Sequence, residues 1–173
     1  YNVTAFEQSL KNNSYINVIN TNMLIPGSDL LANVTGTEFQ LAERSNTYAF
    51  TGSGAYSYNK LNSDETSTGF AAYAAVEKIK GNFKFGIRNL TINDSFDPNF
   101  MGYLQNNNEI ETEVELIYTF FNPFDRILRI NTNLRYEHEM FYNPNHILSS
   151  EINLNIYALT KKHLSLWLNT GGE

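Results

Sequence analysis

The strongest constraint on the fold is a two-residue alternation in residues 109–120, Glu-Ile-Glu-Thr-Glu-Val-Glu-Leu-Ile-Tyr-Thr-Phe. One parity begins with four glutamates, and the other carries only apolar side chains and threonine. Successive side chains of a β-strand point to opposite faces, whereas a helix would scatter both sets around its circumference. The segment is therefore predicted to be a strand with one acidic face and one apolar face.

The same alternation recurs along the chain. Six further segments show it, namely residues 31–43, 48–58, 83–88, 128–139, 151–158 and 163–169. The parity of residues 14–23 stays open. Residues 69–80 are rich in alanine and would also suit a helix, but we expect a strand there because the flanking strands need a partner. These rules predict about ten strands.

The predicted connections alternate in length. Short ones fall near residues 10–13, 44–46, 81–82, 121–125 and 160–162, and longer polar ones near 25–30, 59–68, 95–108 and 140–147. Short turns on one rim and long loops on the other are typical of bacterial outer-membrane barrels, whose strands cross the bilayer in about 9–11 residues. The predicted fold is all-β: an antiparallel up-and-down meander of long strands forming a segment of a transmembrane outer-membrane β-barrel.

Composition narrows the class of protein. The chain has 173 residues, a net charge of −6 and no cysteine, which excludes disulfides and thiolate metal sites. No run approaches the ~20 apolar residues of a membrane helix. Lysine and arginine form no cluster, so we expect no nucleic-acid partner.

Two environments would explain the alternation. In a soluble all-β carbohydrate- or ligand-binding module, Leu128, Ile130 and Leu134 would be buried against a second sheet. Strand length, loop asymmetry and aromatic residues near the predicted rims favour the membrane instead. Those aromatic residues are Tyr48, Tyr58, Tyr118, Phe120 and Tyr136.

A lipid-exposed sheet edge would leave backbone groups unpaired. The chain also ends in Gly171-Gly172-Glu173, without the carboxyl-terminal aromatic residue common in such barrels. Residues 1–173 are therefore expected to be a single segment of a larger barrel, with the remaining strands elsewhere in the precursor.

Several strings carry a family resemblance: Ala32-Asn33-Val34-Thr35-Gly36, Asn46-Thr47-Tyr48, Gly54-Ala55-Tyr56-Ser57, Val76-Glu77-Lys78-Ile79-Lys80-Gly81-Asn82-Phe83 and Phe96-Asp97-Pro98-Asn99-Phe100-Met101-Gly102-Tyr103-Leu104. They resemble the carboxyl-terminal region of a Bacteroidota envelope family of uncharacterised function. The resemblance implies an upstream carbohydrate-binding-type β-sandwich, a bacterial outer-membrane location and a possible glycan partner. It supplies no catalytic residues. Asn99-Phe100-Met101-Gly102 departs from the Asn-Asp-Leu-Gly-like core expected there.

The main candidate site is a lumen charge cluster. Its members are Glu109, Glu111, Glu113, Glu115, Arg88, Arg129 and Arg135. Four carboxylates on one strand face repel unless they are solvated or paired. We expect Arg135 opposite Glu111 or Glu113, and Arg88 within reach of Glu113 or Glu115. The cluster would be a charge-paired, hydrated barrel wall, or a patch that selects cations or binds polar solute.

Other chemistry finds little support. His138 lies between Glu137 and Glu139, but adjacent strand residues face opposite ways, so we predict no zinc site. The loop residues Asn93, Asp94, Asp97 and Asn99 could hold calcium, although a solvated turn is favoured. No Gly-x-Ser-x-Gly elbow occurs. We predict no catalytic residue, metal or cofactor.

The predicted function is non-enzymatic: transport or surface anchoring linked to glycan use. The expected partners are the lipid bilayer and the rest of the barrel or other envelope proteins. The soluble binding module is the alternative. A third possibility, a barrel enzyme acting on lipid or glycan, would need a cluster of titratable groups at one rim.

Overall fold

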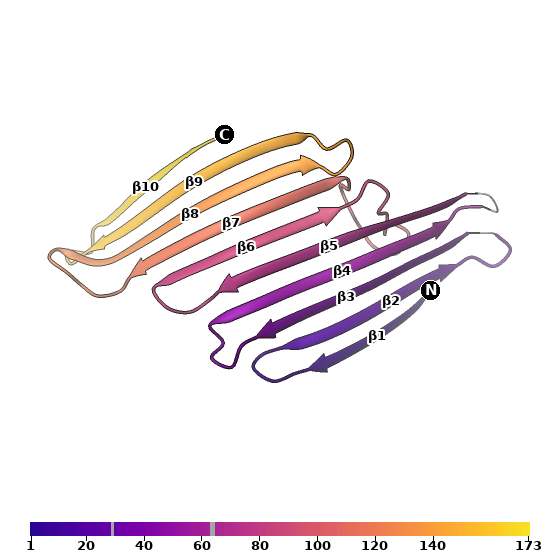
Figure 1. Cartoon of the computed structure of the whole chain (residues 1–173), viewed down its shortest axis with the longest axis horizontal. Helices are drawn as coiled ribbons and strands as arrows, with labels where there is room; N and C mark the ends of the chain where they lie inside the picture. Colours follow the sequence, from indigo (N-terminus) through magenta and orange to yellow (C-terminus); the bar gives the residue numbers. More distant parts are fainter. Residues whose placement is uncertain (29, 63–64) are drawn as a thin grey trace.

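The computed structural model describes residues 1–28, 30–62 and 65–173. They form one ten-stranded antiparallel sheet in which every strand pairs with its neighbour in the sequence (Figure 1). The strands are β1 (Asn2–Ser9), β2 (Tyr15–Leu24), β3 (Leu31–Ala42), β4 (Tyr48–Lys60), β5 (Thr66–Lys78), β6 (Phe83–Ile92), β7 (Glu109–Phe120), β8 (Ile127–Phe141), β9 (Ile147–Thr160) and β10 (Ser165–Gly172). The predicted all-β, up-and-down meander is confirmed, including a strand in the alanine-rich segment. The described residues form no helix that could span a membrane.

The predicted contrast between short and long connections holds only in part. Five connections join the strands at one of their two ends, and all five are tight. Each contains a residue with positive φ, such as Asn46 (51°) and Gly81 (91°). Asparagine and glycine tolerate that left-handed region. At the other end of the strands, residues 93–108 form the one long loop among the residues that the structure describes. The predicted long loop at 140–147 shrinks to residues 142–146, because the flanking strands continue further than the alternation indicates. The predicted loop at 59–68 is shortened in the same way, since β4 continues to Lys60 and β5 begins at Thr66; residues 63–64 of that loop lie outside the described residues.

In-register pairing gives the sheet two distinct faces. On the first, Phe50, Val76, Ile87, Val114, Tyr136 and Ile152 form a row of direct cross-strand neighbours. On the second, the equivalent row is Ala75, Arg88, Glu113, Glu137 and Glu151. We call these the apolar face and the polar face. The segregation follows from the period of two, which keeps each parity on one side across the sheet.

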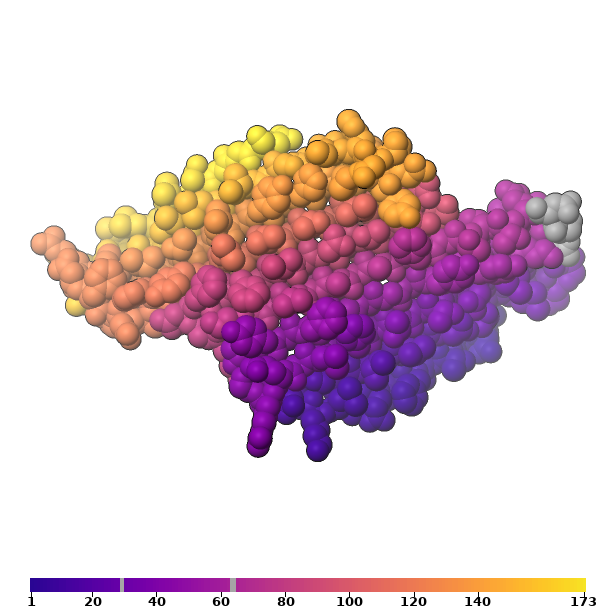
Figure 2. Space-filling view, viewed as in Figure 1, coloured from indigo at the N-terminus to yellow at the C-terminus, as the bar shows by residue number. Residues whose placement is uncertain are grey.

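The apolar face is uncovered. Ile87 and Ile152 are 51% and 50% exposed, although both are aliphatic and lie in the middle of the face. Figure 2 shows no second layer of chain over the face turned toward the reader. The described residues form no second sheet, so Leu128, Ile130 and Leu134 are not buried against one. The buried apolar residues of the described strands, such as Ala49 and Ala75, instead lie on the polar face.

The sheet is open. β1 and β10 lie at opposite edges (Figure 1), and each pairs with a single neighbour within the described chain. Both strands are exposed along their whole length. An edge of this kind presents a row of backbone donors and acceptors that can template another strand. The structure thus contains the meander expected of a barrel wall but not its closure.

Candidate functional site

The candidate site is a charged patch on the polar face, centred on Arg88 of β6. The register places Arg88 directly opposite Glu113 of β7, which lies opposite Glu137 of β8. The Arg88 guanidinium contacts three carboxylates. Its Nη2 lies 2.6 Å from Glu77 Oε1, and its Nη1 contacts Glu113 and lies 3.4 Å from Glu115 Oε2. The expectation that Arg88 reaches Glu113 or Glu115 is met by both residues.

Gly86 makes room for this arrangement. A Cβ atom at Gly86 would lie 3.0 Å from Arg88 Nη2 and 3.1 Å from its Cζ, so the guanidinium lies over the glycine. Gly86 pairs with Glu115 on one side and with Glu77 on the other. The missing side chain therefore opens the space in which one cation meets carboxylates from both neighbouring strands.

Arg135 on β8 is the second cation of the patch. It lies opposite Glu115, so the prediction that it faces Glu111 or Glu113 is wrong. The pairing of Phe120 with Ile130 at the turn sets this register. Arg135 Nη1 lies 3.2 Å from Glu137 Oε1, whereas its nitrogens lie 4.0 Å from Glu113 and Glu115. It is a looser partner than Arg88.

Arg129, the third predicted cation, does not join the patch. It lies at the turn end of β8, opposite Leu159, with its guanidinium 5.6 Å from the centroid of the Phe121 ring. Three members that we did not predict join the patch: Glu137, which contacts Arg135, and also Glu77 and Asn133. Glu77 binds Arg88, and Asn133 Nδ2 donates to Glu115 Oε1 at 2.7 Å. Glu77 could have been found by counting outward from the turn at Gly81, which fixes its pairing with Gly86.

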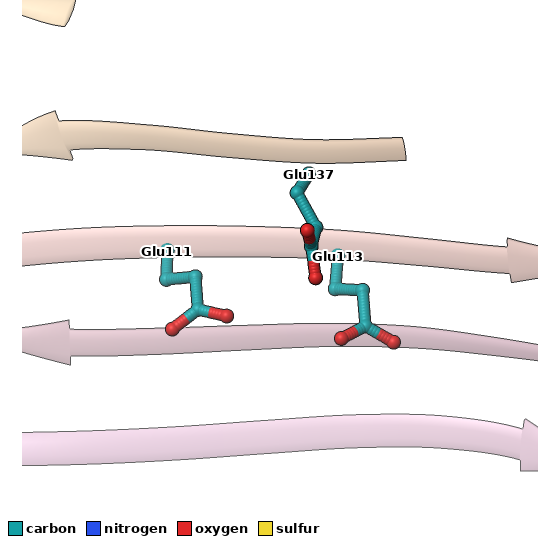
Figure 3. A group of neighbouring side chains, drawn as sticks. All are labelled: Glu111, Glu113 and Glu137. Atoms are coloured by element: carbon teal, nitrogen blue, oxygen red, sulfur yellow. The ribbon is translucent and has the colours of Figure 1, made fainter. Parts of the chain in front are cut away.

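The other end of the ladder lacks compensating charge. Glu111 lies opposite Glu139, and no lysine or arginine of the described chain lies within 4 Å of Glu109 or Glu111. One carboxylate oxygen from each of Glu111, Glu113 and Glu137 lies within 4.8 Å of the other two (Figure 3). Carboxylates suit a hard cation, but Glu113 and Glu137 already contact arginines. We therefore assign an electronegative surface here and no metal.

The long loop, residues 93–108, uses its polar side chains to bond its own backbone and that of its neighbours. Asn93 Oδ1 accepts from the Phe70 amide, Asp97 Oδ1 from the Asn99 amide, and Asn99 Oδ1 from the Leu104 amide. These are turn-stabilising contacts of the kind that Asx residues favour. Asn93, Asp97 and Asn99 thus each use a side-chain oxygen to accept a hydrogen bond from a backbone amide.

Asp94 joins this loop to the β8–β9 connection. Its carboxylate accepts hydrogen bonds from Asn143 Nδ2 at 2.8 Å and from Ser95 Oγ at 3.1 Å. These donors lower the pKa of Asp94 below its ordinary value, because they stabilise the ionised form. A cavity of about 810 Å³ opens between the loop and the ends of β7 and β8. Its lining includes Asp94, Asp97, Glu109, Glu139 and Phe141.

His138 lies on the opposite face from its acidic neighbours, as predicted. It pairs with Thr112 on the apolar face, and its Nδ1 lies 2.7 Å from Ser150 Oγ. The ring stacks against Tyr136 at 6.4 Å between centroids. The histidine therefore takes part in a cross-strand polar pair, and Glu137 and Glu139 lie on the far side of the strand.

Fold and site together define a single-layer antiparallel β protein with one uncovered apolar face and one charged face. Its sequence matches the family model of a domain of unknown function, DUF5916, over residues 1–172. The chain belongs to that family. No curated protein and no solved structure matches it.

Proposed function

We propose that the chain forms part of the wall of a β-barrel in the bacterial outer membrane and that the barrel carries polar solutes. The observation that carries the proposal is the uncovered apolar face, which continues across the sheet and lies back to back with a charged face. A membrane barrel needs this arrangement, with lipid outside and water inside. The sheet edges at β1 and β10 would then pair with further strands, because hydrocarbon does not tolerate unpaired backbone groups.

The position of aromatic residues supports the orientation. Tyr48, Tyr118 and Phe120 lie at strand ends beside the tight turns, and all three lie on the apolar face. Phe120 and Phe124 pack edge to face with centroids 5.2 Å apart. Amphipathic and aromatic rings favour the boundary between hydrocarbon and water. We propose that the strand ends beside the tight turns lie at one membrane interface. Tyr136 lies inside β8 and does not contribute to such a girdle.

Polar residues on the apolar face mark where the lipid-facing belt would end. In the half of β2 near the tight turn, the apolar face carries Ile16 and Val18. In the other half of β2, and beside it on β3, the same face carries a hydrogen-bonded group of polar side chains. Its members are Asn20, Asn22, Asn33 and Thr35, with Asn20 Nδ2 donating to Thr35 Oγ1 at 2.6 Å. Amides are costly in hydrocarbon, so these strand ends would stand outside it.

The charged patch supports a solute preference. Along β7 and β8 carboxylates outnumber arginines on the polar face, and Glu109 and Glu111 have no arginine or lysine beside them among the described residues. Rings of carboxylates favour cations in pores. We therefore propose that the lumen favours cationic or neutral polar solutes over anions. The resemblance to a Bacteroidota envelope family, with its implied upstream carbohydrate-binding-type domain, supports a link to glycan use.

The test is electrical. The full-length precursor is inserted into a planar lipid bilayer, and the reversal potential is measured in a potassium chloride gradient. We expect stepwise conductance with cation preference, and Glu109→Gln with Glu111→Gln should move the reversal potential toward zero. Glu43→Gln is the matched control, because Glu43 lies in a turn at the other end of the strands, and it should leave the reversal potential unchanged. Absence of conductance, or preference for anions, would refute the proposal.

A further inference from the structure

The long loop between β6 and β7 does not extend away from the sheet. It folds back over the polar face and reaches β4 and β5, and in Figure 1 it passes behind β5. Phe96 is the large apolar residue at the point of contact and is only 6% exposed. A loop that buries an aromatic residue is held in place, because undocking the loop would return the apolar surface of that residue to water.

Two buried side chains of β4 hold the backbone of the loop. The Asp97 amide donates to Ser57 Oγ at 3.1 Å, and Asn59 Nδ2 donates to the Asp97 carbonyl at 2.8 Å. Ser57 is fully buried and Asn59 is 2% exposed. Both the donor and the acceptor of one loop residue are thus satisfied by polar side chains that water does not reach, where an unmade bond is most costly.

Gly69 of β5 allows the loop to come this close. It is the cross-strand partner of Ser57, and a Cβ atom on it would lie 2.2 Å from the backbone nitrogen of Phe96. That separation is far below van der Waals contact, and the obstructing atom belongs to the backbone. Any other residue at position 69 would therefore displace the loop from the sheet.

The contact fixes where the loop stands. It begins at the end of β6, crosses to the polar face of β4 and β5, and returns to the start of β7. The cavity of about 810 Å³ lies on its other side, against the ends of β7 and β8. If the polar face lines a lumen, the loop occupies part of the cross-section of that lumen. It does so near the strand ends that lie away from the tight turns.

We infer that residues 93–108 form a docked constriction, which narrows the lumen and is anchored by Phe96, Ser57 and Asn59 against Gly69. The inference rests on the proposed function, because only a lumen can be narrowed. The constriction is fixed rather than a hinged lid, since its anchors are buried and hydrogen-bonded.

The docking is tested first, by a readout that needs no current. Hydrogen exchange at single backbone amides is measured in the folded wild-type full-length protein. The reporter is the Asp97 amide, which donates to the buried Ser57 Oγ, and the control is the amide of Tyr103, a loop residue that is 85% exposed. We expect the Asp97 amide to exchange at least about tenfold more slowly than the Tyr103 amide. Equal rates of exchange at the two amides would overturn the docking.

Narrowing is tested next, by conductance. Gly69→Ala should displace the loop and raise the conductance about twofold. Gly54→Ala is the control, because its new Cβ would meet nothing nearer than 3.9 Å, and it should leave the conductance unchanged. Phe96→Ser releases the same anchor without altering a strand, so it serves if Gly69→Ala fails to fold.

The outcomes separate the two proposals. A conducting wild type whose conductance is unaltered by Gly69→Ala and Phe96→Ser would overturn the constriction and leave the pore intact. No conductance from the wild type or any variant would refute the pore itself, and the constriction with it. Raised conductance in both variants, with slow exchange of the Asp97 amide in the wild-type protein, supports the inference.

Discussion

Arg88 on β6 donates two hydrogen bonds to a single oxygen of Glu77 on β5, from Nη2 at 2.6 Å and from Nε at 3.1 Å. The same guanidinium also contacts Glu113 and Glu115 on β7. One side chain thus joins three consecutive strands on the face that carries most of the negative charge. Arg88 therefore contributes both to the pairing of β5, β6 and β7 and to the balance of charge on the polar face.

The first prediction concerns this cation. Arg88→Met should destabilise the protein by about 1–3 kcal/mol, because hydrogen bonds to charged groups are lost and partly buried carboxylates are left facing one another. Arg88 is 28% exposed. Arg135→Met, the matched control, should cost less than about 1 kcal/mol, because Arg135 is 43% exposed and holds two of its three carboxylates only at 4.0 Å. Urea unfolding of the full-length protein in detergent measures both. An equal or larger loss for Arg135→Met would contradict the account.

The second prediction uses two neighbouring alanines of β5. Ala75 is buried on the polar face opposite Arg88, whereas Ala74 is exposed on the apolar face. Ala75→Leu should destabilise by about 1–3 kcal/mol, because the larger side chain must displace its neighbours. Ala74→Leu should be neutral or stabilising, because it adds apolar surface on the lipid side. The same unfolding experiment compares them, and a reversed order would contradict the assignment of the faces.

The third prediction is a pH dependence at the loop. Because Asn143 and Ser95 lower the pKa of Asp94 in the folded protein, the ionised carboxylate stabilises the contact between the two loops. The stabilisation is present above the unfolded-state value, near the ordinary 3.8, and is lost as the pH falls through the lower folded value. Asp94→Asn should therefore lower the urea midpoint at neutral pH, and the difference should vanish in strong acid. A difference that grows on acidification would show the opposite sign.

The alternation predicts the strands because a period of two is a local property. Glu109 to Glu115 indicate a strand without any knowledge of their partners, and β7 is found there. The register between two strands is not a local property, because it depends on the turn that joins them. The position of Arg135 depends on how many residues the β7–β8 turn takes, and the sequence pattern does not specify that number. A difference of at least two residues in the register therefore changed the partner of Arg135 from Glu111 or Glu113 to Glu115.

Glu77 was missed for a related reason. It follows a run of alanines whose small side chains hide the parity of β5, so its face could not be read until the turn at Gly81 set the pairing. The docked loop is further out of reach. The Asp97 amide binds Ser57, which lies 40 positions earlier in the sequence. A serine or a glycine in a strand does not indicate by itself that a distant loop will contact it. Such contacts depend on tertiary packing, which no window of the sequence contains.

The measurement that tests the central claim most directly is the depth of the apolar face in a bilayer. Single cysteines replace Leu116, Leu134 and Leu154, which are direct cross-strand neighbours on that face, and are labelled with an environment-sensitive fluorophore. Asn133→Cys, on the polar face, is the control. We expect lipid-borne nitroxides to quench the first three labels and only water-soluble quenchers to reach the fourth. Quenching of all four labels by the water-soluble agent alone would place the apolar face outside the membrane and contradict the account.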